Sequence, residues 1–340
     1  TVEEITIIYR RCKKKLFPGA ARNFGASLAS SKWIAFLDSK TVPNSNWLKM
    51  TLETAISKNA YLVFGKTKYK ALTRFQSFLI DSTYGYKPID TVPGTLVSKK
   101  IFLDTGGFNP NVRSGEDIQW KANVSEENFY INVDDEAALT YSSLPRNLYK
   151  AIKKFFMYQM YGALVDIQIN ARSLFLAVFL ILITLIVPRW NSMLPGWDAN
   201  PLYLPNITKI YILSLTFLTM ILLIFNRSFF LKLKTSPLAR ALKIAFLILS
   251  ITIALRWNYI FAGFVESSSL YIPHITKIYL SLIVCSAIYY RGIYFPIKHG
   301  LILKNIFPFR WIGIGILGLL LDLAKAPGYL LGAIWKMFKL

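Results

Sequence analysis

The second half of the chain is dominated by long apolar runs. They cover residues 172–188, 207–225, 241–262 and 275–290. A helix that crosses a membrane needs about 17–25 residues, so each run is near that length, although the fourth is short. The helices of a soluble bundle would each carry a polar stripe, so these apolar runs favour membrane spans over a soluble bundle. The pattern therefore predicts a transmembrane region of about four helices within residues 166–340.

The end of the chain has a different pattern. Residues 308–340 alternate glycine with leucine and isoleucine, and Asp322 and Lys325 then stand three positions apart. Two residues at that spacing can pair on one face of a helix. We expect a C-terminal amphipathic helix that lies in the membrane interface or re-enters it, rather than a fifth span.

The first half alternates short β-rich runs with helical segments. Strands are predicted at 3–9, 33–37 and 61–66, a turn followed by an alanine-rich helix within 18–31, and a helix near 46–58. Strand–helix–strand alternation is typical of an α/β domain with a largely parallel sheet. We assign this domain to residues 1–165. In such sheets, ligands bind at the carboxyl ends of the strands.

Charge separates the two halves further. The 340 residues carry a formal net charge of +22, and residues 171–340 hold 17 basic but only 3 acidic residues. Most of these basic residues lie in the connections 226–243 and 291–310. Basic residues at the edges of apolar runs indicate a membrane protein rather than a nucleic-acid-binding protein. The positive-inside rule places both connections, and with them the N-terminal domain, in the cytoplasm.

Two groups of acidic residues are candidates for chemistry. Asp38 directly follows the strand predicted at 33–37, where a carboxylate can hold Mg²⁺ or Mn²⁺ against a diphosphate, although Asp also often starts a turn. Glu116 and Asp117 begin a predicted helix, where the helix dipole alone favours carboxylates. Paired carboxylates in a cleft can also supply a general base for a hydroxyl nucleophile. The residues alone leave both interpretations open.

Four sequence motifs follow one another in the first half. They are PGAARNFG (18–25), FLDSKTVPNSNWL (36–48), VPGTLVSKKIFLDTGGF (92–108) and GEDIQW (115–120). Their order and spacing together resemble the family 2 glycosyltransferases, which have the GT-A fold. The resemblance covers about residues 3–165. It implies a Rossmann-like α/β catalytic domain, here followed by the all-α transmembrane region.

The resemblance assigns residues to the donor side of the site. Arg22 and Asn23 resemble residues that line the nucleotide-diphosphate site, where an arginine makes charge-assisted bonds to phosphate. Asp38 matches the first acid of a DxD metal motif. Gly94 and Thr95 resemble the segment that lies under the donor sugar.

The resemblance also assigns the acceptor side. Gly106, Gly107 and Phe108 match the loop that shapes it. Asp117 matches the catalytic base, with Glu116 beside it. The implied reaction is a single displacement at the anomeric carbon with inversion.

The metal motif departs from the family pattern, because it reads Asp38-Ser39-Lys40 and its second acid is a lysine. Three alternatives follow. Lys40 stabilises the diphosphate directly without a metal, a metal binds more weakly through Asp38 alone, or activity is lost. A divalent cofactor, Mg²⁺ or Mn²⁺, is therefore an open expectation.

Two other departures concern the start of the chain and processivity. The family fold begins with a strand whose acidic end recognises the nucleotide base, and nothing here provides one. We expect an N-terminal β–α–β portion of about 50–70 residues to be absent from this sequence.

The QxxRW motif of processive synthases is also missing, and YQMYG (158–162) occupies a comparable place. This favours transfer of one sugar per encounter.

Together these features predict an integral membrane glycosyltransferase with a cytoplasmic catalytic domain, in the inner membrane if the source is bacterial. Its expected partners are a nucleotide-sugar donor and a lipid-linked or membrane-proximal glycan acceptor, with a role in cell-envelope polysaccharide. Nucleic acid is not expected as a partner. The alternative is a catalytically silent membrane scaffold or partner subunit derived from a glycosyltransferase, which Lys40 motivates.

Overall fold

The computed structural model divides the chain into two compact units. The N-terminal unit comprises residues 1–67 and 90–139, and the C-terminal unit comprises 68–89 and 140–340. The structure describes residues 6–126, 131–132, 135–165, 190–193, 199–204, 249, 256–263, 265–271, 284–285 and 287–339. The sequence places a domain boundary at 165, whereas residues 140–165 group here with the C-terminal unit.

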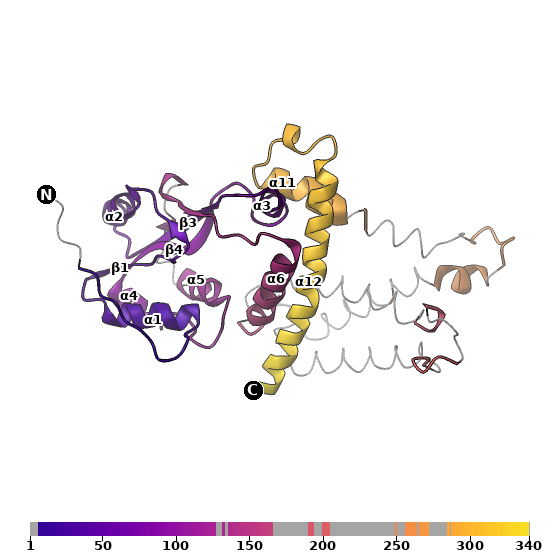
Figure 1. Ribbon diagram of the computed structural model, residues 1–340, viewed down its shortest axis with the longest axis horizontal. Helices are drawn as coiled ribbons and strands as arrows, with labels where there is room; N and C mark the ends of the chain where they lie inside the picture. The colour runs from indigo at the N-terminus through magenta and orange to yellow at the C-terminus, as the bar shows by residue number, and fades with distance from the viewer. Residues whose placement is uncertain are drawn as a thin grey trace. The chain divides into compact units, whose positions relative to one another are not determined.

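The N-terminal unit is built on a mixed β-sheet (Figure 1). Its strands are β1 (Trp33–Ala35), β2 (Thr41–Val42), β3 (Leu62–Tyr69), β4 (Ile89–Ser98), β5 (Ile131–Asn132) and β6 (Leu139–Tyr141). They are ordered β1-β4-β3-β6-β2, and β5 pairs with β3. The β3–β5 pair is parallel, but β1 and β4 are antiparallel, with Ile34 opposite Val97. The expectation of a largely parallel sheet is corrected at that pair, because strand-forming runs do not specify direction.

Helices cover both faces of this sheet (Figure 1). They are α1 (Pro18–Leu28), α2 (Trp47–Ser57), α4 (Lys99–Asp104) and α5 (Glu116–Glu126). Along β3, Leu62 and Phe64 pack with α1, α4 and α5, whereas Val63 packs with α2. This alternation follows from the two-residue period of a strand. The two cores fix the positions at which α1, β1 and α5 present side chains.

One predicted strand is wrong where the structure describes it. Residues 6–9 of the strand expected at 3–9 have no regular secondary structure and are exposed, and residues 3–5 lie outside the described residues. The β-branched residues of this run supply strand propensity, but propensity is effective only where a partner strand and a core are available.

The C-terminal unit contains the long helix α12 (Arg310–Lys339), drawn in yellow in Figure 1. The other described elements of this unit include α3 (Arg74–Leu79), the π-helix η1 (Ile80–Tyr84), α6 (Leu148–Gly162), the 3₁₀ turn η4 (Asn191–Met193), the π-helix η6 (Tyr290–Tyr294), α11 (Phe295–Lys298) and the 3₁₀ turn η7 (Leu303–Asn305). Glycines bring α12 against α6. A Cβ atom added to Gly332 would lie 2.0 Å from the carbonyl oxygen of Met160, and one added to Gly328 would lie 2.5 Å from that of Phe156. Only glycine permits this approach.

The structure describes few of the residues that bear on the membrane predictions. The expected spans 172–188 and 207–225 lie outside the described residues, and those at 241–262 and 275–290 are described only in part. Among the described residues, one helix is long and apolar enough to cross a membrane: the 27-residue stretch Arg310–Lys336, with a mean hydropathy of 1.5. The chain end expected to be interfacial thus forms a continuous helix of spanning length. Of its most apolar window of residues, 56% is buried within the protein. The core helix of a soluble protein can have the same length, hydropathy and burial.

Candidate active site

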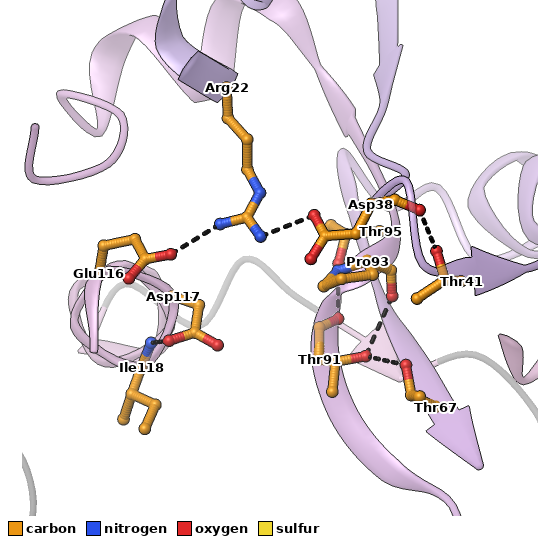
Figure 2. Close-up of polar contacts among 10 residues, drawn as sticks. All are labelled: Arg22, Asp38, Thr41, Thr67, Thr91, Pro93, Thr95, Glu116, Asp117 and Ile118. Carbon is orange, nitrogen blue, oxygen red and sulfur yellow. Dashed lines mark hydrogen bonds and ion pairs between the residues drawn. The ribbon is translucent and has the colours of Figure 1, made fainter. Parts of the chain in front are cut away.

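Arg22 joins two acidic residues that lie far apart in the sequence. It projects from α1, while Asp38 follows β1 and Glu116 is the first residue of α5. Its Nη2 lies 2.8 Å from Oδ1 of Asp38, and its Nη1 lies 2.9 Å from Oε1 of Glu116. Figure 2 shows the guanidinium between the two carboxylates. The resemblance assigns these three residues to one site, and the fold brings them into contact.

The Glu116 carboxyl is the more buried of the two partners. Its side chain is 5% exposed, and its Oε2 has no hydrogen-bond partner among the described residues. Burial, together with the charge of Asp117, raises the pKa of Glu116 to about 6, although Arg22 opposes the shift. Burial on its own would lower the pKa of Arg22, because it disfavours the charged form. The negative charges of Asp38 and Glu116 have the larger combined effect, so the Arg22 pKa is raised. The site therefore holds a carboxyl that titrates near neutral pH.

Asp117 is the second residue of α5 and lies beside this ion pair (Figure 2). Its Oδ1 accepts a hydrogen bond of 2.8 Å from the backbone N–H of Ile118. Burial raises the pKa of Asp117, while that hydrogen bond and Arg22 lower it. A carboxylate with a raised pKa is a stronger base than a solvated one, so Asp117 is chemically suited to accept a proton.

Asn23 fixes the loop that precedes α5. Its Nδ2 donates to the carbonyl oxygen of Phe108 at 2.7 Å, and its Oδ1 accepts from the Phe108 N–H at 2.9 Å. Gly107 has a φ of +64°, and a Cβ there would lie 2.9 Å from Asn23 Oδ1. Asn23 is thus engaged with the Gly106–Phe108 loop. The guanidinium of Arg22 also lies 5.5 Å from the centre of the buried Phe108 ring.

Gly94 and Thr95 lie in β4 beside the segment that ends in Asp38. The Gly94 N–H donates to the carbonyl oxygen of Phe36 at 2.7 Å, and the Phe36 N–H donates to that of Thr95 at 2.9 Å. The Thr95 hydroxyl accepts from the Gly65 N–H at 3.0 Å and donates to the Thr91 carbonyl at 3.1 Å. Figure 2 shows Thr95 near Asp38. The fold therefore brings this candidate donor segment close to the strand end that carries Asp38.

Lys40 is exposed in the turn after Asp38. Thr41 closes this turn, since its Oγ1 donates to the Asp38 carbonyl at 2.8 Å. Within the described residues, no group of three His, Cys, Asp or Glu side chains is placed to hold a metal ion. Asp38 is the single carboxylate of its motif and is already paired with Arg22.

Two residues of the site region were not singled out from the sequence. A Cβ at Gly19 would lie 2.6 Å from the carbonyl oxygen of Asn109, so glycine lets α1 approach the loop before α5. Trp47 donates from Nε1 to the Gly94 carbonyl at 3.0 Å and holds β4 from the α2 side. Both residues lie inside the quoted motifs, so their place in those motifs was the available signal.

The sequence of this region identifies its class. Residues 2–110 match the family model described as glycosyl transferase family 2. Residues 2–110 therefore belong to a family 2 glycosyltransferase domain, and the α/β sheet with helices on both faces fits the GT-A fold. The match ends before Glu116 and Asp117, so the roles of these two residues remain proposals.

Particular relatives agree with this class. The chain is 29% identical over 134 residues to an uncharacterized glycosyltransferase of Rickettsia bellii (strain RML369-C), covering 36% of this chain and 19% of that protein. It is 29% identical over 119 residues to the pre-mycofactocin glycosyltransferase of Mycobacterium tuberculosis (strain CDC 1551 / Oshkosh), covering 30% and 25%. The matches thus span only about a fifth to a quarter of these relatives.

One solved structure is also similar, that of S. aureus TarS 1–349 in complex with UDP-GlcNAc. It matches with a TM-score of 0.32 and 14% identity, over 54% of this chain and 59% of that one. A superposition this weak adds nothing to the assignment, which rests on the family match.

Proposed function

We propose that the chain is a membrane-attached, inverting glycosyltransferase that moves one sugar from a nucleotide-sugar donor to a lipid-linked or membrane-proximal hydroxyl. The observation that carries this proposal is the bridge from Arg22 to Asp38 and Glu116, with Asp117 alongside. It joins three of the four motifs that resemble the family.

In the proposed reaction, Asp117 takes the proton of the acceptor hydroxyl as that oxygen attacks the anomeric carbon. The bond from this carbon to the donor's diphosphate breaks, and the nucleoside diphosphate leaves with the electron pair. Attack opposite the leaving group inverts the configuration. Glu116 supports the base by holding Arg22, whose cation can offset charge on the diphosphate.

The metal requirement is part of the proposal. The charge on the leaving diphosphate needs a cation, and Arg22 and the exposed Lys40 are candidates on this chain. Asp38 remains the one residue of the motif that can contact Mg²⁺ or Mn²⁺. Transfer that persists in EDTA would support Lys40 and Arg22 as the stabilising cations, whereas recovery with added Mn²⁺ would support a metal at Asp38.

Membrane attachment and a cytoplasmic active site are proposed from the sequence pattern. The four apolar runs, the basic connections at 226–243 and 291–310, and the spanning length of α12 support them. A membrane region of this size suits an acceptor that itself resides in or near the bilayer.

The experiment that tests the function is a donor screen on the protein in membranes. Release of nucleoside diphosphate is measured for a panel of nucleotide-sugars, with EDTA and with Mn²⁺. Turnover of one donor supports the proposal. If no donor is turned over under either condition, the catalytically silent scaffold is the better account.

A further inference from the structure

The segment between α11 and α12 presents a row of apolar side chains to the outside. Within residues 302–309 of this segment, large apolar residues are exposed at four of the eight positions, and Phe309 is 76% exposed. The others are Ile302, Leu303 and Phe307. Single exposed apolar residues are ordinary on protein surfaces, but a contiguous group marks an interaction site.

The same segment is firmly attached to the C-terminal unit from its inner side. Ile306 is 0% exposed and packs with the buried Leu301 and Ile314. Trp311 donates from Nε1 to the carbonyl oxygen of Pro308 at 3.1 Å, and its backbone N–H donates to that of Ile306 at 3.0 Å. Because these inward residues occupy the core, the exposed apolar side chains are held facing outward.

An ion pair between the partly buried Arg310 and the buried Asp81 fixes the point where the segment becomes α12. Arg310 donates from Nη2 to Oδ2 of Asp81 at 2.6 Å and to Oγ of Ser77 at 2.7 Å. The Asp81 side chain is fully buried. Breaking one partner of such a pair leaves an uncompensated buried charge, so this end of the helix is held in place.

Positive charge surrounds the apolar row. Lys298 and Lys304 are exposed before and within the segment, and the sequence contains no Asp or Glu from residue 267 to residue 321. Lys87 is exposed in a turn joined to α11 through the hydrogen bond of 3.0 Å from the Tyr86 N–H to the His299 carbonyl. Exposed apolar residues with exposed lysines before and among them match the chemistry of an anionic lipid surface.

We propose that residues 302–309 insert into the headgroup region of an anionic bilayer and set the depth of the C-terminal unit at the membrane. This inference rests on the proposed membrane attachment. A lipid surface is favoured over a protein partner for two reasons. The apolar row continues directly into a helix of spanning length, and the exposed charged residues named here, Lys87, Lys298 and Lys304, are all basic. Side chains of this kind enter the bilayer by about 5–10 Å.

Depth-dependent fluorescence quenching tests the insertion without relying on transfer activity. The exposed cysteines Cys12 and Cys285 are replaced by Ser, and Phe309→Cys is labelled with bimane in the full chain. The protein is placed in phosphatidylcholine–phosphatidylglycerol nanodiscs with doxyl groups at shallow or deep acyl positions. Ile56→Cys, an apolar site of similar exposure in the N-terminal unit, is the matched control. Leu320→Cys, exposed within α12, reports membrane attachment itself.

The proposal expects strong loss of fluorescence at position 309 with shallow doxyl lipids, none at position 56, and quenching by deep doxyl lipids at position 320. The double variant Lys298→Glu, Lys304→Glu should weaken the quenching at 309.

Quenching at 320 but not at 309 would overturn the insertion and leave the attachment intact. If neither site is quenched, attachment has failed as well. A label at 309 that is shielded from soluble iodide but not quenched by lipid would indicate a protein partner or second copy, and would also overturn the proposal.

Discussion

At the scale of single residues, Arg22 is the side chain on which the candidate site depends. Its two ion pairs keep the Asp38 and Glu116 carboxylates on either side of one cation. Without it, the carboxylates of Asp38 and Glu116 would lie near each other with no cation between them. In the proposed function the same cation meets the donor diphosphate, for which an arginine offers several donors in a planar fork.

Replacing Arg22 with Gln should lower the rate of sugar transfer by about 100-fold or more, the range seen when a stabilising donor is removed from an active site. The pKa of Glu116 should also rise further, since Arg22 lowers it in the native protein. Steady-state kinetics with the donor found in the screen measures the first effect. The matched control is Arg11→Gln, an exposed arginine outside regular secondary structure. An Arg22→Gln enzyme as fast as the control would remove Arg22 from the mechanism.

Glu116 gives the folded protein a pH dependence of stability. Its pKa is raised from 4.5 to about 6, so the folded state binds the proton more tightly than the unfolded state. This contribution is fully present below pH 4.5 and is lost as pH rises through about 6. A shift of that size corresponds to about 2 kcal/mol in the free energy of unfolding.

Glu116→Gln should therefore flatten the fall in thermal stability between pH 4.5 and 6.5. Unfolding temperatures across that range measure the slope. The control is Glu53→Gln, an exposed residue of α2, whose slope should follow the parent protein. A Glu116→Gln slope equal to that of the parent would mean that another group dominates this pH window.

At the scale of elements, glycines decide how closely α12 packs on α6. Gly332→Ala would place a methyl group 2.0 Å from the Met160 carbonyl oxygen, so the helices must separate. Overpacking of this kind costs about 1–3 kcal/mol of unfolding free energy. Gly162→Ala makes the same chemical change in α6, where a Cβ meets no atom within 4 Å, and should be neutral or slightly stabilising. Thermal unfolding of both variants in nanodiscs compares them. Equal effects would contradict the close packing.

The sequence predicted those elements whose signals are local. The strands and helices near 33–37, 61–66, 18–31 and 46–58 agree with the structure to within a few residues. Two predictions did not agree: the strand at 3–9, over its described residues 6–9, and the parallel direction at the β1–β4 pair. Both depend on partners that lie far away in the chain. The chain-end helix was correctly expected to be helical, but its continuity over 30 residues was not foreseen, since Pro327 and repeated glycines weaken the local helix signal.

The same distinction applies to the site. The motifs named Arg22, Asp38, Glu116 and Asn23 as site residues. What they did not state is that Arg22 pairs with both acids and that Asn23 is engaged with Phe108 rather than open to a ligand. Such contacts span up to 94 residues of chain and follow from the packing of α1 against α5.

At the scale of the whole molecule, the excess of positive charge has two distinct roles in our account. In the C-terminal half it lies at the ends of apolar segments of the sequence, where we propose that it orients the protein and favours anionic lipid. In the N-terminal unit, Arg22 and Lys40 lie where a nucleotide diphosphate is proposed to bind.

The most direct test of this account is sugar transfer by Asp117→Asn in the full-length protein in membranes, with the donor that the parent enzyme uses. Asparagine keeps the shape of the side chain but cannot accept the acceptor's proton. We predict a loss of at least about 100-fold in product formation, in line with general base catalysis, with donor binding retained. Asp104→Asn, an exposed aspartate at the end of α4, should keep the parent rate. Product formation by Asp117→Asn at the parent rate would contradict the account.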